Sequence, residues 1–187
     1  MKFTDRLLQR WRIAKVSKEL ASDARILDIG SADGALFAAL GAKVGAGSLG
    51  VDPTLARPLT VNGCRLLPGT FPDAVPPGTA PFDAITLLAV LEHFPPEAYE
   101  ALRTGCEKFL KPGGKLLITV PSPHVDKILA LLQFLRLVDG MSLEEHHGYD
   151  VAITPEIFPA PTFRLVRRKM FQLGLNNFFV FERTDAK

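Results

Sequence analysis

Residues 25–34 read R-I-L-D-I-G-S-A-D-G, and this stretch decides the fold. Two apolar residues run into an acidic residue and then into a turn of small residues. A buried parallel strand passes in this way into a ligand-binding loop and the helix that follows it. Gly30 and Gly34 lack a Cβ, so they allow the backbone to turn tightly and to approach a ligand closely. The stretch predicts a strand over residues 25–29 and a helix over residues 35–40, which Gly41 ends.

A second acidic residue, Asp52, stands in G-V-D-P after the glycine turn. Its spacing from the turn suits the end of a second strand, where a carboxylate can accept hydrogen bonds from ribose hydroxyls. The competing interpretation is that Asp28 and Asp52 only cap loops, as aspartates often do. The motifs that surround the two aspartates favour the ligand-binding interpretation.

Later stretches continue the alternation of strands and helices. A short strand is expected over residues 65–67, after the turn signal N-G at residues 62–63. Residues 82–88 are apolar almost throughout, which is typical of a central strand covered on both faces. Residues 110–114 read L-K-P-G-G, a turn in which proline ends a helix before a strand over residues 115–120.

In this order the motifs resemble those of the class I methyltransferases that use S-adenosylmethionine, over residues 24–120. The first motif of that family is an acidic residue, any residue and then Gly-x-Gly-x-Gly, and here Ala32 stands in place of the middle glycine. The fourth motif often reads F-D-x-I-x-x-x-x-V-L-E-H, and it is matched here by Phe82, Asp83, Val90, Leu91, Glu92 and His93. The resemblance implies an α/β, Rossmann-like fold: a seven-stranded, mostly parallel sheet with helices on both faces and an antiparallel last strand. Residues 163–170 and 178–183 are expected to be its last two strands.

The resemblance also implies S-adenosyl-L-methionine as the cofactor. By analogy with the family, Asp28 orders the glycine turn near the methionine amino group, and Leu88 and Ala89 lie near the methionine portion. Thr70 and Phe71 follow the third strand, where the adenine ring is expected, although the acidic residue usual there is missing. The expected cofactor-binding residues are Asp28, Gly30, Ser31, Gly34, Asp52, Pro53, Thr70, Phe71, Leu88 and Ala89.

Methyl transfer needs an acceptor held in line and, where that acceptor carries a proton, a group that removes it. His93 leaves the fourth motif close to the expected methyl group, and histidine titrates near neutral pH. Its alternative role is a local one at the start of a helix. His147 is a second candidate base, with Tyr149 as an orienting group, although the polar cluster of residues 144–150 also suits a solvated loop. No histidine or cysteine spacing indicates zinc, so we expect no metal.

The chain is expected to be a single domain over residues 1–187. Residues 1–22 are expected to be an N-terminal helix or lid, with its helix over residues 2–21. This basic helix either packs on the sheet as a solvated helix or meets an acidic substrate or an anionic membrane surface. Residues 124–161 are expected to be a substrate-side insertion. Within it, the apolar residues 125–138 form either a buried helix or a face for a membrane, a lipid-linked substrate or a partner.

Composition narrows the class of protein further. The chain has 187 residues, a hydrophobic fraction of 47% and a net charge of +2, which fit one globular domain without the basic balance of a nucleic-acid-binding protein. Cys64 and Cys106 have no metal spacing and are expected to be reduced core residues, which suits a cytoplasmic location. The first residues have no apolar signal core, and no apolar run reaches the roughly 18 residues that a membrane span needs.

The prediction is therefore an S-adenosylmethionine-dependent methyltransferase that acts on a small-molecule or a cell-envelope, lipid-linked acceptor. A nicotinamide-dependent oxidoreductase would need G-x-G-x-x-G, and the glycines here have a different spacing. The alternative is a catalytically degenerate methyltransferase-like protein with a partner-binding or regulatory role, which Ala32 and the missing adenine acid permit.

Overall fold

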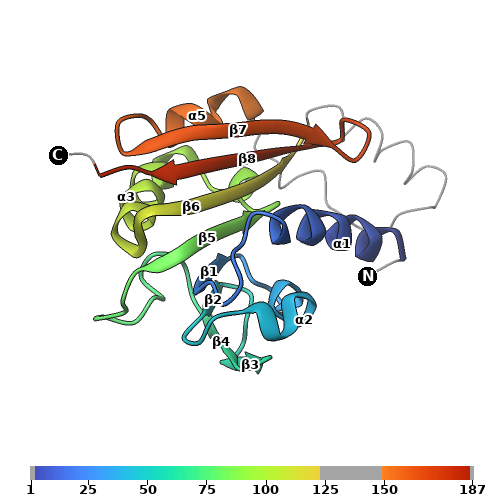
Figure 1. Cartoon of the computed structure of the whole chain (residues 1–187), viewed down its shortest axis with the longest axis vertical. Coiled ribbons are helices and arrows are strands. Elements are labelled where there is room, and N and C mark those ends of the chain that lie inside the picture. The colour runs from blue at the N-terminus through green and yellow to red at the C-terminus, as the bar shows by residue number, and fades with distance from the viewer. Residues whose placement is uncertain (1–2, 123–148, 186–187) are drawn as a thin grey trace.

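The computed structural model describes residues 3–122 and 149–185. Over these residues, eight strands form one sheet in the order β3-β4-β2-β1-β5-β6-β8-β7 (Figure 1). The strands are β1 (Ile26–Ile29), β2 (Leu49–Asp52), β3 (Leu59–Val61), β4 (Cys64–Pro68), β5 (Phe82–Leu88), β6 (Leu110–Pro121), β7 (Phe163–Phe171) and β8 (Asn176–Arg183). The helices are α1 (Phe3–Ser17), α2 (Ala35–Leu40), α3 (Tyr99–Phe109) and α5 (Thr154–Ile157), with 3-10 turns η1 (Gly41–Lys43), η2 (Leu91–His93), η3 (Pro96–Ala98) and η5 (Val151–Ile153).

The sheet is parallel from β4 through β2, β1 and β5 to β6. The last strand, β8, runs antiparallel to both of its neighbours, β6 and β7. The predicted Rossmann-like sheet with an antiparallel last strand is therefore confirmed. The limits predicted for β5 and α2 agree with the structure, and Gly41 lies at the end of α2 as expected.

The predicted count of seven strands is one too low among the described residues, because β3 precedes β4 in a hairpin. Asn62 and Gly63, which were predicted to turn, connect the two strands at φ of +49° and +76°. Such left-handed pairs are typical of tight hairpin turns. β3 was missed because it has three residues on the edge of the sheet and none of them is fully buried.

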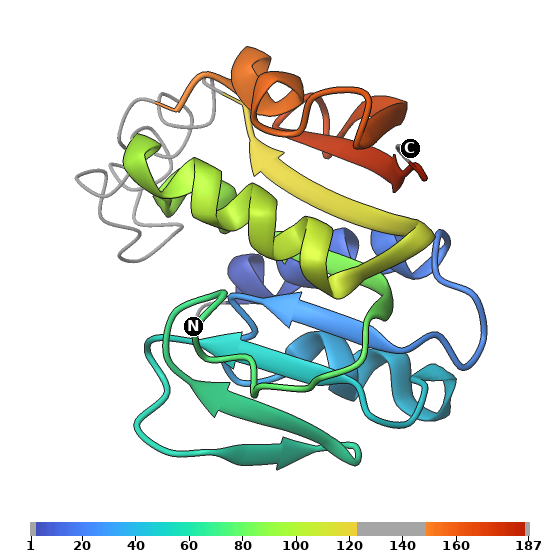
Figure 2. The ribbon, with the colours of Figure 1, turned by 90° about the vertical axis from the view of Figure 1, so that its left-hand side faces the viewer.

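Helices cover both faces of the sheet (Figure 2). One face packs under α1 and α2, where Ile13 and Phe37 meet side chains of β1 and β4, and Val16 meets β6 and β8. The other face packs under α3 and α5, where Leu102 and Ile157 join the larger core. β1 is buried at every position, so it forms the centre of this sandwich.

The N-terminal helix is shorter than the predicted 2–21, since α1 ends at Ser17. Lys115 Nζ donates to the carbonyl of Glu19 at 2.9 Å and lies 3.3 Å from its carboxylate. These tertiary contacts hold the chain after α1 against β6 instead of allowing the helix to continue. The described helices include none that is long and apolar enough to cross a membrane.

The predicted helix over residues 125–138 lies outside the described residues, as does most of the expected insertion over residues 124–161. The part of this insertion that the structure describes starts at Tyr149 and contains η5 and α5. The carboxylate of Asp150 accepts a hydrogen bond from the backbone N–H of Ala152 at 2.8 Å, and this caps η5.

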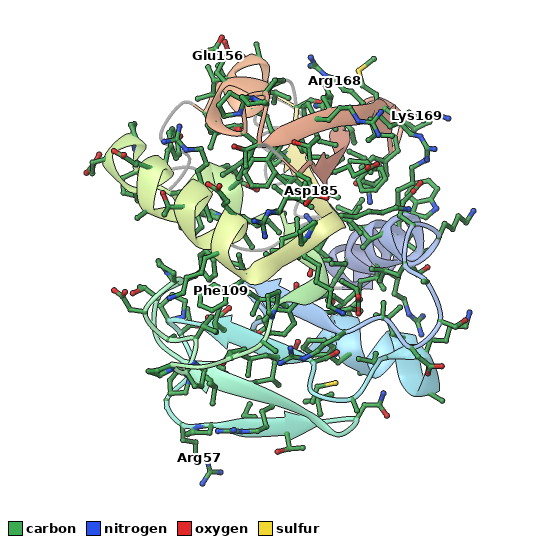
Figure 3. The ribbon with its side chains drawn as sticks, turned by 60° about the vertical axis from the view of Figure 1, so that its left-hand side comes forward. Arg57, Phe109, Glu156, Arg168, Lys169 and Asp185 are labelled. Carbon is green, nitrogen blue, oxygen red and sulfur yellow. The ribbon has the colours of Figure 1, made fainter. Side chains whose placement is uncertain are left out.

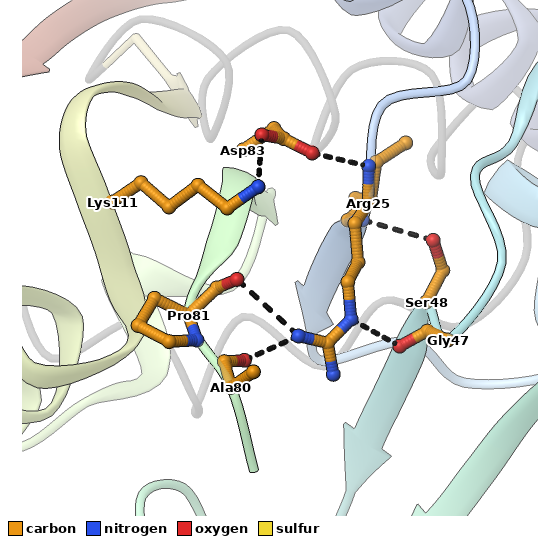
Figure 4. Close-up of polar contacts among 8 residues, drawn as sticks. Arg25, Gly47, Ser48, Ala80, Pro81, Asp83 and Lys111 are labelled. Atoms are coloured by element: carbon orange, nitrogen blue, oxygen red, sulfur yellow. Dashed lines mark hydrogen bonds and ion pairs between the residues drawn. The ribbon is translucent and has the colours of Figure 1, made fainter.

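A polar network fixes the amino-terminal end of the sheet (Figure 4). Asp83 of β5 accepts a hydrogen bond from the backbone N–H of Arg25 at 2.8 Å, and Lys111 Nζ lies 2.6 Å from its other oxygen. The Arg25 guanidinium reaches the carbonyls of Gly47 and Ala80 at 2.9 and 2.5 Å. The glycine turn and the motifs that follow β2, β4 and β5 lie at the opposite end, because parallel strands all end at the same edge of the sheet.

Candidate active site

The glycine turn is held between β1 and β2. The backbone N–H groups of Gly30 and Ser31 donate to the carbonyl of Val51 at 2.9 and 3.2 Å. Gly30 has a φ of +75°, and a Cβ at this position would lie 2.3 Å from Cγ2 of Val90. Only glycine combines this φ with such a close approach, so the turn depends on Gly30.

Asp52 fixes the tip of the same turn. Its Oδ2 accepts a hydrogen bond from the backbone N–H of Ala32 at 2.7 Å. Its Oδ1 accepts from the N–H and the hydroxyl of Thr54 at 2.8 and 2.5 Å. Ala32, which replaces the family's middle glycine, has a φ of +42°. The carboxylate therefore stabilises an alanine in a left-handed conformation that favours glycine.

Asp28 has a different neighbour from the one predicted. Its Oδ1 accepts a hydrogen bond from the Thr86 hydroxyl at 2.6 Å. The carboxylate that accepts a hydrogen bond from the turn is that of Asp52. Burial raises the pKa of Asp28 to about 7, the Thr86 hydrogen bond opposes this rise, and the charge of Asp52 adds to it. Asp28 is thus a buried carboxyl group beneath the turn that binds a proton near neutral pH.

A cavity of about 440 Å³ opens beside the turn. Its lining comes from the ends of β1, β2 and β4 and from the segment after β5, and the predicted residues among it are Gly30, Pro53, Thr70, Phe71 and His93. The Phe71 ring is 8% exposed and packs edge-on against Phe109 with 6.1 Å between the ring centroids. The cavity therefore has one rigid aromatic wall.

A second cavity, of about 60 Å³, lies between the turn and α1. The predicted residues Asp28, Gly30, Ser31 and Leu88 line it. Gly30 lines both cavities, so the two adjoin at the turn. The Ser31 hydroxyl is buried and has no hydrogen-bond partner among the described residues, which leaves it available to a ligand.

Gln9 and Arg12 of α1 also line this smaller cavity, and the sequence did not single them out. The only signal was that residues 1–22 were expected to form a lid. Neither the helical pattern nor the positive charge of this segment indicates which face of α1 meets the turn.

Three predicted cofactor residues line neither cavity among the described residues: Gly34, Asp52 and Ala89. Gly34 starts α2 at a φ of +79°, and its N–H donates to the carbonyl of Ser31 at 2.8 Å. The Ala89 N–H donates to the Thr119 carbonyl at 2.9 Å and has a φ of +59°. All three shape the backbone around the cavities.

Glu92 is a further candidate for the site, which the sequence indicated only as one of the matches to the fourth motif. It is 2% exposed, and its Oε2 has no hydrogen-bond partner among the described residues. Burial raises the pKa of Glu92 to about 7, and the positive charge of Arg12 opposes the rise. Glu92 lines neither cavity, but its neighbours Val90 and His93 line the larger one, and a buried carboxyl group with such a pKa is typical of functional sites.

Tyr149 lies on the same side of the site as Glu92. Its hydroxyl is 2.7 Å from that of Thr154. Burial raises the pKa of Tyr149, and the charges of Tyr99 and Glu92 contribute to the rise. His147 lies outside the described residues. The described residues contain no group of three or more His, Cys, Asp or Glu placed to hold a metal ion.

The sequence and the structure of this chain both resemble those of known methyltransferases. A family model described as a methyltransferase domain matches residues 2–151. The ubiquinone biosynthesis O-methyltransferase of Xylella fastidiosa is 35% identical over 117 residues, a match that covers 58% of this chain and 46% of that protein. The protein of the same name from Xanthomonas oryzae pv. oryzae is 34% identical over 118 residues and is covered to 48%. The chain spans about half the length of these relatives.

Solved structures share the fold at lower identity. The magnesium protoporphyrin IX methyltransferase of Synechocystis, solved with bound SAH, has a TM-score of 0.69 at 15% identity, over 98% of this chain and 89% of that one. The 1,6-didemethyltoxoflavin-N1-methyltransferase of Burkholderia thailandensis, solved with 1,6-didemethyltoxoflavin and S-adenosylhomocysteine, has a TM-score of 0.68 at 18% identity, over 98% and 81%. At these identities the likeness concerns the fold.

Proposed function

The chain belongs to the methyltransferase domain family, and from this premise we propose that it transfers a methyl group from S-adenosylmethionine to a small-molecule acceptor. The observation that carries the proposal is the pair of cavities that adjoin at Gly30. They lie at the carboxyl ends of parallel strands, where open α/β sheets bind their ligands. One cavity is large and partly aromatic, and the other is small and polar.

The two cavities suit the two ends of the cofactor. The larger one, with Phe71 and Thr70, fits a planar base and its ribose. The smaller one contains the Arg12 guanidinium and the unpartnered hydroxyl of Ser31, which fit the carboxylate of the methionine end. The carboxylate of Asp52 has about four lone-pair sites, and it accepts three hydrogen bonds within the protein. The remaining site can accept a hydrogen bond from one ribose hydroxyl.

When bound, S-adenosylmethionine supplies a methyl group on a sulfonium, which is already a good leaving centre. The protein must therefore hold the acceptor and take up any proton that the acceptor loses. We propose that Glu92 takes up this proton and that Tyr149 orients the acceptor. Glu92 is close enough to Arg12 and to Tyr149 for both to interact with it electrostatically.

His93 lines the larger cavity and is the second candidate for the proton acceptor, as the sequence predicts. The acceptor atom proposed is oxygen, since the relatives from Xylella and Xanthomonas are named O-methyltransferases. A lipid-linked or cell-envelope acceptor is the narrower form of this proposal. The apolar side chains Leu7 and Trp11, exposed on α1, support it.

Calorimetric titration with S-adenosylmethionine and with S-adenosylhomocysteine tests the cofactor site. We expect micromolar binding of both ligands to the wild type and at least a tenfold loss in Arg12→Gln, because a charged hydrogen bond contributes about 1.5–3 kcal/mol. Arg57→Gln is the control, since Arg57 is exposed and lines neither cavity. Figure 3 shows its side chain extending from the lower end of the molecule. If neither ligand binds to protein that circular dichroism shows to be folded, the enzyme proposal fails. The degenerate, partner-binding alternative then takes its place.

A further inference from the structure

The large apolar side chains that are exposed among the described residues gather on two neighbouring elements. Leu7 and Trp11 lie on α1, and the others lie on β7 and in the turn to β8: Leu165, Val166, Met170 and Leu173. Met170 is 70% exposed and Leu173 is 96% exposed. Scattered apolar residues on a surface need no explanation, but their concentration on two elements does.

The same two segments concentrate positive charge. Residues 3–17 and 163–175 contain eight of the 22 lysines and arginines but one of the 20 aspartates and glutamates. The rest of the chain then has 14 basic and 19 acidic residues, so it is net negative. The basic side chains of α1 include the exposed Arg6 and Arg10, and those of β7 are Arg164, Arg167, Arg168 and Lys169. Arg164 and Arg167 form ion pairs with Glu182 and Glu19, so the positive charge of this surface comes from the other basic residues. Figure 3 shows Arg168 and Lys169 extending outward from β7.

Contacts join the two segments into one surface. Gln172 Nε2 in the β7–β8 turn donates to the carbonyl of Leu8 in α1 at 2.8 Å. The row Leu7, Trp11 and Lys15 follows helical i, i+4 spacing, and Lys15 Nζ lies 6.0 Å from the ring centroid of Phe171. The exposed row of α1 therefore meets the end of β7 on the face that carries Lys169 and Phe171, whereas Arg168 packs over Phe179 on the opposite face of the sheet. Figure 1 shows the β7–β8 turn on the same side of the molecule as α1.

The turn between β7 and β8 exposes an apolar side chain, that of Leu173, at its tip. Gln172 and Leu173 have φ of +53° and +57°, although neither is glycine. Residues in this region cost about 1 kcal/mol or more each, and Leu173 gains no packing in return. A tight hairpin turn requires such a left-handed pair, so the conformation follows from the hairpin, and the exposed leucine at its tip is the feature that remains to be explained.

We propose that α1 and the β7–β8 turn form a docking surface, residues 6–15 and 169–173, for an anionic phospholipid bilayer. Basic side chains attract anionic headgroups, and tryptophan, leucine and methionine enter the boundary between headgroups and acyl chains. A nucleic acid would use the basic residues but would gain little from an exposed Leu173. Self-pairing of β7 would bring its arginines together, which is unfavourable.

The docking surface lies on the outer side of the helix that lines the smaller cavity. Trp11 is 53% exposed, whereas the next residue, Arg12, lines that cavity. A protein docked in this way has its active site next to the bilayer, where a lipid-linked acceptor would lie. The docking proposal itself does not depend on methyl transfer.

Co-sedimentation with vesicles tests the proposal. We expect the full chain to sediment with vesicles that contain phosphatidylcholine and phosphatidylglycerol, and not with phosphatidylcholine alone, and we expect salt to weaken the binding. Trp11 is the only tryptophan, so its emission should shift to the blue on binding. Absence of sedimentation and shift, or equal binding to both vesicles, would overturn the proposal.

Variants locate the surface. Arg10→Gln with Lys169→Gln should lower the affinity for anionic vesicles about tenfold or more, because each basic residue contributes about 1 kcal/mol. Leu173→Asn should lower it about tenfold, and asparagine tolerates the left-handed φ, so the fold should persist. Arg57→Gln, which removes one positive charge outside the docking surface, is the control and should bind as the wild type does. Wild-type binding by both surface variants, or a dimer in ultracentrifugation that these variants disrupt, would refute lipid docking. Cofactor titration remains an independent readout of the methyltransferase site.

Discussion

The carboxylate of Asp52 accepts a hydrogen bond from the backbone N–H of Ala32, with 2.7 Å between Oδ2 and the nitrogen. The two residues stand twenty positions apart and lie at the ends of neighbouring parallel strands, β2 and β1. The contact holds the tip of the glycine turn at a φ of +42°, which an alanine seldom adopts unaided. The shape of the proposed cofactor site thus depends on a residue that lines neither cavity.

Asp52→Asn should weaken this turn. The amide keeps the side-chain volume but places an N–H₂ group against either Ala32 or Thr54, which leaves a buried donor unpaired. We expect a loss of about 1–3 kcal/mol in the free energy of unfolding and at least tenfold weaker binding of S-adenosylhomocysteine. Chemical denaturation and calorimetry measure the two effects.

Asp83→Asn is the matched control, since Asp83 also accepts a backbone N–H, that of Arg25, at the opposite end of the sheet. It should reduce stability but leave the affinity for S-adenosylhomocysteine unchanged. An equal loss of affinity in both variants would contradict a local role for Asp52.

Gly30→Ala should abolish measurable cofactor binding. The added Cβ would lie 2.3 and 2.8 Å from the two methyl groups of Val90, and the φ of +75° adds strain. Gly63→Ala imposes a similar φ of +76° in an open turn, with no atom within 4 Å of the new Cβ. Both variants should lose about 1–2 kcal/mol of stability to the backbone, and only Gly30→Ala should lose affinity in calorimetry. Normal affinity in Gly30→Ala would refute the proposed site.

Stability should fall as the pH rises from about 4 to 7. Burial raises the pKa of Glu92 from its ordinary value of 4.5 to about 7, so in this window the folded state holds a proton that the unfolded state has released. The free energy of unfolding then decreases with pH and levels off above about 7, by up to about 3 kcal/mol for this group. Asp28 contributes in the same direction.

Glu92→Gln should make this pH dependence shallower in denaturation experiments at several pH values. Glu97→Gln, at an exposed position on η3, should leave it as in the wild type. An unchanged slope in Glu92→Gln would show that the buried carboxyl group does not hold its proton at neutral pH.

Activity should rise with pH if Glu92 is the proton acceptor, because a base must first be deprotonated. We expect kcat/KM to increase up to about pH 7, and Glu92→Gln to lower kcat by about 10²–10⁴-fold and to remove this limb. His93→Gln separates the two candidates, since both residues follow β5. If the limb disappears in His93→Gln but persists in Glu92→Gln, His93 is the base.

The order of the elements was readable because its signals are local. Residues 82–88 form an apolar run, and a strand buried on both faces needs such a run, so the limits of β5 were predicted correctly. Gly41 follows helix formers and ends α2, since glycine is the usual residue past a helix end. The hairpin strand β3 carries no comparable apolar signal, so only its turn was recognised.

The partners of the site residues were not readable in this way. The sequence placed Asp28 and Asp52 at strand ends, but strand order decides that Asp52 reaches Ala32 and that Asp28 meets Thr86, 58 residues away. The tertiary structure decides that Glu92 is buried and that its carboxyl group interacts electrostatically with Arg12 and Tyr149. No periodicity indicates these contacts.

By itself, therefore, the sequence determined the alternation of strands and helices and the position of the glycine turn, because apolar periodicity and the φ preferences of glycine act within a few residues of the chain. The antiparallel last strand was predicted from the resemblance to the methyltransferase family. The tertiary structure alone decided which carboxylate holds the turn, which helix face brings Arg12 to the smaller cavity and which carboxyl group binds a proton near neutral pH. These properties depend on burial and on distances between segments that the sheet brings together, and such distances are set only when the strands pair.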